Sequence, residues 1–439
     1  MEVCIKDLGI NGEGVTRLES GEFANKVCFV DFALPDEVVD IDISGNKSKF
    51  CKGKINKIIN RSAYRIEPRC PYFTICGGCD MQHLEISKQR DFKRDRVTQA
   101  LRKVVEDSNC VTSTQYSNEW GYRNKMVFAV REENGKKKIG MFERNSHKVV
   151  EISSCVLTND TINAVFNKIR DYILSSTHTA FDERTKKGEI KYIVLREHLG
   201  NILVTIVTTK NIDLKPLYEC LSSTYRVGIS IVISSSDTEI LAGKYKHLYG
   251  LEYLEINEYG IDYKLNNLGF LQVNNDMKKA MYDRVLLDIE PDTNVIDAYS
   301  GAGLLSAILS SKAKTVTGIE INSSASASAQ ALAKENKIEN ITFICDDVEK
   351  SLPSALDGLS NVTLVLDPPR SGCSRGVCET ILDSASSINK IIYISCNPAT
   401  LGRDLELLSK SFAVKTVIPY DLFPQTKHVE TLVVMERKE

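Results

Sequence analysis

A cysteine that follows a strongly apolar run is the residue best placed to do chemistry in this sequence. Ile391-Ile-Tyr-Ile precedes Ser395-Cys396-Asn397-Pro398, and four successive β-branched or aromatic residues predict a strand buried on both faces. Pro398 ends this strand, and a helical pattern follows it. Cys396 is therefore expected at the carboxyl end of a central strand, where open α/β sheets carry their reactive groups. A buried structural thiol is the alternative interpretation.

Two carboxyl groups suggest what a thiol could do there. A thiolate is needed when the acceptor carbon is a poor nucleophile, as uracil C5 is until a thiolate adds to C6. Asp367-Pro-Pro-Arg370 forms a rigid turn that could hold a planar substrate edge. Glu430, just ahead of the last apolar run, could remove the C5 proton, and His428 is a second candidate base. Asp-Pro-Pro turns also bind amines in amino-directed methyltransferases, so N-methylation is the alternative activity.

The elements that must position these residues alternate regularly over the last third of the chain. Such alternation predicts an α/β fold with a doubly wound, mostly parallel sheet, here over residues 266–439. The strand-like runs are 294–299, 315–321, 341–345, 362–367 and 391–394, and the helical patterns are 303–312, 323–336, 375–386 and 398–410.

A glycine-containing loop after the first of these strands predicts a cofactor site. In Asp297-Ala-Tyr-Ser-Gly301-Ala-Gly303 the glycines allow a ligand to approach the backbone at a helix N-terminus. Glu320, at the end of the next strand, could accept hydrogen bonds from both ribose hydroxyls. The loop has no Lys or Arg to hold a pyrophosphate, which favours a phosphate-free nucleoside such as S-adenosylmethionine (AdoMet). Asp346-Asp347 could meet the adenine or cap the next helix.

Three cysteines upstream have the spacing of metal ligands. Cys70, Cys76 and Cys79 follow a C-x5-C-x2-C pattern, and the Gly-Gly between the last two lets the backbone wrap tightly. All-cysteine ligation suits tetrahedral zinc or an iron–sulfur cluster, and the spacing does not choose between them. The candidates for a fourth ligand are Cys51, Cys110 and Cys155.

The N-terminal half has the pattern of a nucleic-acid-binding protein. Short alternating runs and turns over residues 1–60 predict a five-stranded barrel of the OB type, and residues 61–265 have a mixed α+β pattern. Between Lys47 and Lys103 there are 15 Lys and Arg against 5 Asp and Glu, which fits a phosphate backbone or a solvated basic face. Trp120-Gly-Tyr-Arg-Asn-Lys125 could clamp single-stranded bases or form a strand-edge turn.

Composition limits the class of protein. A chain of 439 residues is long enough for two or three domains. No apolar run approaches the roughly 18 residues of a membrane span, and no signal-peptide pattern is present, so we expect a cytoplasmic protein. Its 13 cysteines then indicate metal binding or catalysis before disulfides.

Taken together, these motifs resemble the uracil-5 RNA methyltransferase family, iron–sulfur enzymes that make 5-methyluridine. Leu8-Gly-Ile-Asn-Gly-Glu-Gly-Val and Ala33-Leu-Pro-Asp-Glu-Val resemble its TRAM domain, with Asp36 where the family usually has Gly. The resemblance implies a class I AdoMet methyltransferase fold and a [4Fe–4S] cluster. Its cluster ligands are Cys70, Cys76, Cys79 and Cys155; its donor-binding positions are Gln272 of Phe270-Leu-Gln-Val-Asn, Tyr299, Gly301, Gly303, Glu320, Asp347 and Asp367. By the same resemblance, Cys396 is the nucleophile and Glu430 the base.

The resemblance also implies an RNA partner. A TRAM-like domain favours 23S rRNA, with uridine-54 of tRNA as the alternative, and we expect a monomer. Ser300 and Leu304 stand where many members of the family have Cys and Asn. These departures support a different class of function, an RNA-binding iron–sulfur protein with an inactive transferase domain.

Overall fold

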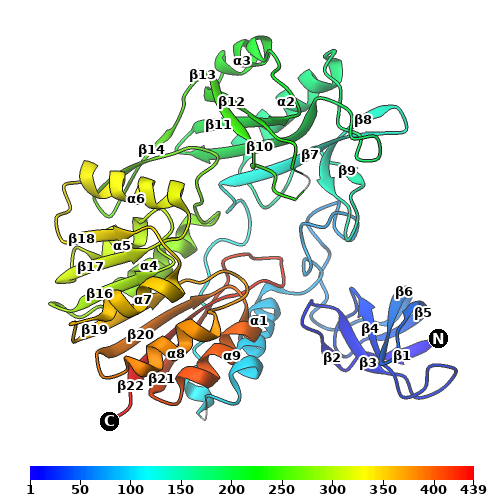
Figure 1. Ribbon diagram of the computed structural model, residues 1–439. Helices are drawn as coiled ribbons and strands as arrows, with labels where there is room; N and C mark the ends of the chain where they lie inside the picture. The colour runs from blue at the N-terminus through cyan, green and yellow to red at the C-terminus, as the bar shows by residue number, and fades with distance from the viewer. Residues whose placement is uncertain (106, 237) are drawn as a thin grey trace.

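Three β-sheets organise the chain in this computed structural model, which describes residues 1–105, 107–236 and 238–439 (Figure 1). The first sheet has the order β1-β5-β6-β4-β3-β2. Its strands are β1 (Glu2–Cys4), β2 (Asp7–Leu8), β3 (Gly14–Arg17), β4 (Val27–Asp31), β5 (Val38–Asn46) and β6 (Phe50–Asn60). Because β1 and β2 stand at opposite ends of the sheet but only two residues apart in sequence, the N-terminal segment closes it into the predicted small barrel.

Asp36 in this barrel explains one departure from the TRAM pattern. It has a φ of 68°, in the left-handed region that favours glycine. Aspartate tolerates this region better than most residues with a side chain, so the turn keeps its shape with Asp in place of Gly.

The second sheet lies in the middle of the chain and has the order β13-β12-β11-β10-β7-β8-β9. Its strands are β7 (Lys125–Glu133), β8 (Lys136–Phe142), β9 (Val149–Glu151), β10 (Ile190–His198), β11 (Asn201–Thr208), β12 (Arg226–Ile233) and β13 (Lys244–Gly250). Helices α2 (Asp160–Ser175) and α3 (Lys215–Ser222) pack apolar side chains against it. A hairpin of β14 (Leu254–Glu258) and β15 (Ile261–Leu265) leads to the third sheet.

The third sheet has the order β18-β17-β16-β19-β20-β22-β21. Its strands are β16 (Asn294–Ala298), β17 (Thr315–Ile319), β18 (Ile341–Ile344), β19 (Val362–Leu366), β20 (Ile388–Ser395), β21 (Phe412–Tyr420) and β22 (Glu430–Arg437). The first five pair in parallel, and β22 pairs antiparallel with both of its neighbours. The strand order reverses between β16 and β19, which is where open α/β sheets bind ligands.

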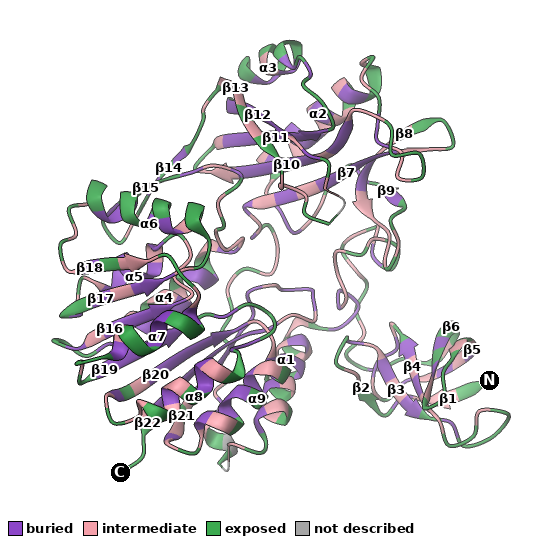
Figure 2. Ribbon diagram, in the orientation of Figure 1, coloured by how far each residue is buried: buried purple, intermediate pink, exposed green. Residues whose placement is uncertain are grey.

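Helices cover both faces of this sheet, and the strands between them are buried (Figure 2). One face carries α4 (Asn275–Asp288), α5 (Leu304–Leu309) and α6 (Ser323–Glu335). The other face carries α7 (Val348–Leu356), α8 (Arg375–Asp383), α9 (Pro398–Leu408) and also α1 (Ile86–Leu101), which belongs in sequence to the middle of the chain. Gly402 permits this packing, since a Cβ there would stand 2.4 Å from the Ala100 carbonyl oxygen.

No helix formed by the described residues is long and apolar enough to cross a membrane.

Candidate active site and cysteine cavity

Cys396 and Glu430 lie at the same edge of the third sheet, on adjacent strands. In the antiparallel pairing of β20 with β22, Ser395, the last residue of β20, stands opposite Thr431. Cys396 directly follows Ser395, and Glu430 directly precedes Thr431. Asp367 follows β19, on the other side of β20. The chain thus brings the three predicted reactive residues together.

The electrostatics of this group show how close its members are. Burial first, then the negative charges of Glu430 and Asp367, raise the pKa of the Cys396 thiol, and Arg370 opposes them. Burial and Asp367 raise the pKa of Glu430 to about 8. Asp367 keeps solvent access, but the protein packed around it and the nearby Asp297 raise its pKa to about 7. Groups with such pKa values exchange protons readily near neutral pH.

Arg370 was not predicted as a site residue, and its backbone joins the two reactive turns. Its carbonyl oxygen accepts hydrogen bonds from Asn397 Nδ2 at 3.1 Å and from Thr400 Oγ1 at 3.3 Å. Asn397 Oδ1 in turn accepts from the Ala399 N–H and caps α9. The Asp-Pro-Pro-Arg turn is therefore fixed to the turn that carries Cys396.

Asp404 anchors Cys373, at the far end of the loop that begins with the Asp-Pro-Pro-Arg turn. Like Arg370, Asp404 was not predicted as a site residue. It is 1% exposed, and its Oδ2 accepts from the Cys373 N–H at 2.8 Å and the Tyr393 hydroxyl at 2.7 Å. The helical pattern could have identified it, because Asp404 falls on the buried side of α9 beside Leu401 and Leu405. A buried carboxylate needs hydrogen-bond partners.

The glycine loop after β16 has the backbone shape that a close ligand approach requires. Tyr299, Gly301 and Gly303 have φ values of 70°, 55° and 81°. A Cβ on Gly303 would lie 2.6 Å from the Ala329 Cβ, so only glycine fits there. Glu320 accepts from the Gly301 N–H at 3.0 Å and from the Asn322 N–H at 2.7 Å, which fixes its carboxylate beside the loop.

Asp347 lies beside Tyr299 of this loop. Tyr299 and Asp347 line one cavity with Pro369 and Cys373. Asp347 also caps α7 by accepting from the Glu349 N–H at 2.8 Å.

Gln272 lies between β15 and α4. Its carbonyl oxygen is held by Asn124 Nδ2 at 3.1 Å. Its side chain is partly exposed. Asn274 of the same motif is structural, since it caps α4 and donates to the Leu422 carbonyl oxygen.

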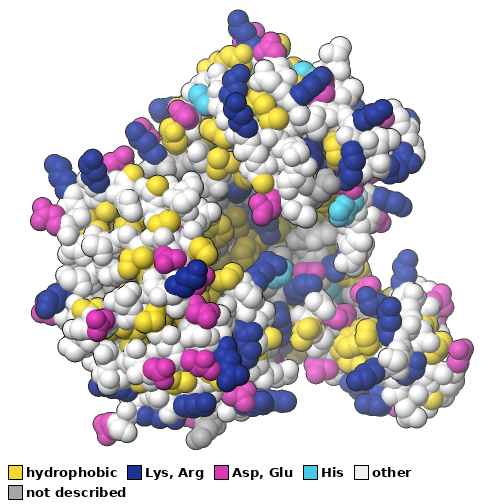
Figure 3. All heavy atoms as spheres, in the orientation of Figure 1, with side chains coloured by type: hydrophobic (Ala, Val, Ile, Leu, Met, Phe, Trp, Pro, Cys, Tyr) yellow, Lys and Arg dark blue, Asp and Glu magenta, His cyan; other side chains and the backbone are white. Residues whose placement is uncertain are grey.

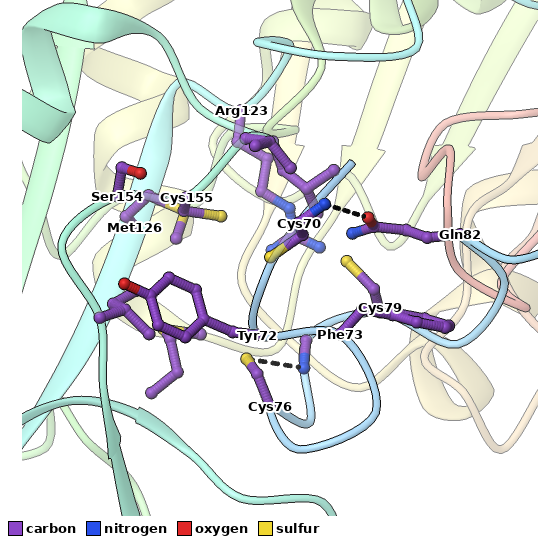
Figure 4. A pocket seen from close by; sticks show the side chains of 15 residues that line it. Cys70, Tyr72, Phe73, Cys76, Cys79, Gln82, Arg123, Met126, Ser154 and Cys155 are labelled. Atoms are coloured by element: carbon purple, nitrogen blue, oxygen red, sulfur yellow. Dashed lines mark hydrogen bonds between the residues drawn. The ribbon is translucent and has the colours of Figure 1, made fainter. Parts of the chain in front are cut away.

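Four cysteines face a single cavity beside the second sheet (Figure 4). Cys70, Cys76 and Cys79 come from one loop, and Cys155 comes from the segment between β9 and α2. The other sequence candidates for a fourth ligand lie elsewhere: Cys51 in the barrel core and Cys110 against the third sheet. Most of the remaining lining is apolar, from side chains such as Phe73, Met126, Met141 and Ile152.

The spacing of these thiols bears on what they could hold. No group of three or more His, Cys, Asp or Glu within the described ranges is placed to bind a single metal ion. The donor set is all cysteine, and the Gly78 N–H points to Cys76 Sγ at 3.4 Å. An all-cysteine set suits an iron–sulfur cluster as well as tetrahedral zinc.

The segment Trp120–Lys125 packs into the interior between the sheets. Tyr122 and Asn124 are buried, and the Tyr122 hydroxyl donates to the Pro424 carbonyl oxygen at 3.1 Å. Arg69 lies over the Trp120 ring at 5.4 Å. Most of this segment therefore has the structural role that was one of its two interpretations.

Known proteins share this layout. A family model described as tRNA (Uracil-5-)-methyltransferase matches residues 85–438, and a TRAM domain model matches residues 1–55. An uncharacterized RNA methyltransferase of Clostridium tetani is 32% identical over 443 residues, which cover 98% of this chain and 95% of that protein. One from Lactobacillus johnsonii is 34% identical over 453 residues, covering 100% and 98%.

A solved structure is similar over the whole chain. The Pyrococcus abyssi tRNA (uracil-54, C5)-methyltransferase, in complex with S-adenosyl-L-homocysteine, has a TM-score of 0.80 and 21% identity, and the match covers 99% of this chain and 100% of that one. The fold and site thus define an AdoMet-dependent RNA methyltransferase with an N-terminal TRAM domain. The chain belongs to the tRNA (uracil-5-)-methyltransferase family, the RNA uracil-5 methyltransferases. The predicted family, fold class and enzyme class are confirmed.

Proposed function

We propose that this protein methylates C5 of a uridine in RNA through a covalent bond between Cys396 and uracil C6. The favoured substrate is 23S rRNA. The observation that carries the proposal is that Cys396, directly after β20, lies within electrostatic reach of Glu430, the first residue of β22, and of Asp367. Methylation of an amine needs no nucleophile, so this arrangement favours carbon over nitrogen as the acceptor.

Each residue has a defined part in the reaction. The Cys396 thiolate adds to C6, and the electron pair moves through the ring to make C5 nucleophilic. AdoMet bound at the glycine loop would supply an electrophilic methyl group for C5. Asp367 holds the uracil edge, and Glu430 then takes the C5 proton while the bond from Cys396 to C6 breaks. Arg370 favours the charged forms of both Cys396 and Glu430.

The cofactor proposal follows from the two sites. Gln272, Tyr299, Gly301, Gly303, Glu320, Asp347 and Asp367 would bind AdoMet. Cys70, Cys76, Cys79 and Cys155 would hold a [4Fe–4S] cluster, which is supported by the family resemblance and by the cavity that all four cysteines line. Since all of these residues come from one chain, a monomer suffices.

Surface features support an RNA substrate. Figure 3 shows the molecule hollowed between the second and third sheets, with hydrophobic side chains on the floor and Lys and Arg nearby. An extruded base could enter such a hollow, as enzymes that act on bases require. The barrel favours rRNA. The fold shared with the Pyrococcus abyssi tRNA (uracil-54, C5)-methyltransferase makes tRNA the second candidate.

We expect labelled methyl groups to appear as 5-methyluridine when the full-length protein acts on rRNA from a strain that lacks the gene. Cys396→Ala should bind AdoMet but form neither product nor adduct, because no thiolate can activate C5. Glu430→Gln should accumulate a protein–RNA adduct on a denaturing gel, because the methylated intermediate keeps its proton. A nucleoside methylated on nitrogen, or turnover by Cys396→Ala, would refute the mechanism. Labelled methyl groups found in tRNA alone would show that the substrate is tRNA and not rRNA.

A further inference from the structure

The segment that leads to Glu430 is unusually buried for a connection between strands. Residues 421–429, here called the base segment, join β21 to β22, and none of them is classed as exposed. Connections between strands normally run over the surface, where water satisfies their polar groups. Buried ones need partners within the protein. The base segment finds them in parts of the chain that lie more than 300 residues away.

The loop that carries the cysteines supplies the first partners. The Asp80 and Met81 N–H groups both donate to the Gln425 carbonyl oxygen at 3.0 Å. Asp80 Oδ2 accepts from the Lys427 N–H at 3.3 Å. Asp80 directly follows Cys79, and Arg144 binds both residues, at 3.0 Å to the Asp80 carboxylate and 2.8 Å to the Cys79 carbonyl oxygen. A shift of Cys79 would therefore move Gln425.

Helix α1 supplies the second set through Gln89, which is fully buried. Gln89 Nε2 donates to the Met81 carbonyl oxygen at 2.9 Å and to Gln425 Oε1 at 3.0 Å. Its Oε1 accepts from the Gln425 N–H at 3.1 Å. One side chain thus joins the cysteine loop to the base segment.

Gln425 itself holds a backbone conformation that its surroundings must enforce. Its φ is 69°, which is uncommon for a residue other than glycine. Farther along α1, Lys93 forms a fully buried ion pair with Asp421 and donates to the Phe423 carbonyl oxygen at 3.1 Å. Together these contacts fix the base segment from Asp421 to Lys427.

We infer that the cysteine loop and α1 are a positioning device for the proton-abstracting base, coupled to the base segment through Gln89 and Gln425. The inference rests on the role proposed for Glu430 and on the cluster proposed for the four cysteines. The donor site is held by separate contacts, such as Glu320 with Gly301 and Asp404 with Cys373. Loss of the cluster would then release the base segment while the donor site keeps its shape.

Hydrogen exchange of the full-length, iron-loaded protein tests the coupling directly. Gln425→Ala removes the side-chain bond to Gln89, and Gln89→Met removes the junction with little change in volume. Both should speed amide exchange in residues 421–429 about tenfold or more, because local opening becomes easier. Gln115→Ala is the matched control: Gln115 is exposed, and its backbone N–H bonds to the Pro419 carbonyl oxygen nearby. Iron-depleted wild-type protein should show the same faster exchange.

Adduct measurements test the consequence for catalysis. Gln425→Ala should slow turnover about tenfold, accumulate protein–RNA adduct and leave the Kd for S-adenosylhomocysteine and the iron content unchanged, because a small displacement of a catalytic group is costly. Unchanged exchange in both variants or after iron removal would overturn the inference, and so would slower turnover without adduct. If wild-type protein and Glu430→Gln never form an adduct, the proposed function fails, and the exchange data still decide the coupling.

Discussion

Glu430 and Cys396 repel each other when both are ionised. The thiol must lose a proton before it can attack, yet an ionised Glu430 makes that loss harder. Arg370 lies near both groups and lowers the pKa of each. One cation in the site therefore sets the pH at which the thiolate and the base form together.

Replacing Arg370 should move the pH dependence of catalysis upward. Without its positive charge, the pKa values of Cys396 and Glu430 rise further, so Arg370→Gln should lose about tenfold in single-turnover rate at pH 7 and recover at higher pH. Arg370→Lys keeps the charge and serves as the control. A pH profile parallel to that of the wild type would contradict this role.

Glu430→Gln should stabilise the fold at high pH. The pKa of Glu430 is about 8 in the folded protein and about 4.5 in an unfolded chain, so folding free energy is lost as the pH rises from about 4.5 to 8 and the loss is complete above 8. Denaturant unfolding should show a gain of about 2–4 kcal/mol at pH 9 and much less at pH 5. Glu436→Gln, on the same strand but half exposed, should show no such trend.

At the scale of elements, the strand–turn–helix units were well predicted, because local patterns define them. The runs over 294–299, 315–321, 341–345 and 362–367 became β16, β17, β18 and β19 with ends shifted by a residue or two. The glycine loop and Cys396 were located for the same reason, since each sits where a strand ends. Helix α7, which contains Pro353, was missed, and so were strand β21 and helix α4. Charged residues interrupt the apolar pattern in β21 and α4, and their packing partners are distant in sequence.

Gly303→Ala should weaken donor binding without unfolding the sheet. A methyl group there collides with Ala329 and Phe343 and is strained at a φ of 81°, so the loop must move. We expect the Kd for AdoMet to rise about tenfold or more by calorimetric titration. Gly358→Ala has a similar φ but open space around its Cβ, and should keep wild-type affinity. Equal affinities for the two variants would mean that the loop shape does not matter.

At the scale of the whole molecule, contacts between distant segments hold the parts together, and these escaped sequence analysis. Nothing local in the sequence around Gln89 points to Gln425, and the spacing of cysteines could not select Cys155 from three candidates. In the barrel, Glu37 is fully buried and forms a two-pronged ion pair with Arg65, at 2.5 and 2.7 Å. Next to it, Phe32 meets Phe73 of the cysteine loop edge-on at 5.3 Å.

Glu37→Gln should loosen the barrel from the rest of the protein. It leaves the Arg65 guanidinium buried without its counter-ion, which typically costs about 3–5 kcal/mol. Limited proteolysis should then cut near residue 62 faster than in the wild type, and RNA affinity should fall. Glu67→Gln is the control, because its ion pair with Arg61 is exposed and contributes about 0–1 kcal/mol. Equal cleavage of both variants would show that the pair does not fix the barrel.

The position of α1 also has a consequence for how the chain is made. Its apolar side chains Val97 and Leu101 join the core of the third sheet, and Lys93 meets Asp421, 328 residues later in the sequence. At a synthesis rate of about 5–20 residues per second, α1 leaves the ribosome roughly 15 to 65 seconds before its partner exists. During that time its apolar face is open to chaperones and to other chains. Strand β21 and Asp421, which pack against this helix, are made just before β22, which brings the base, so a product truncated before β21 would have neither.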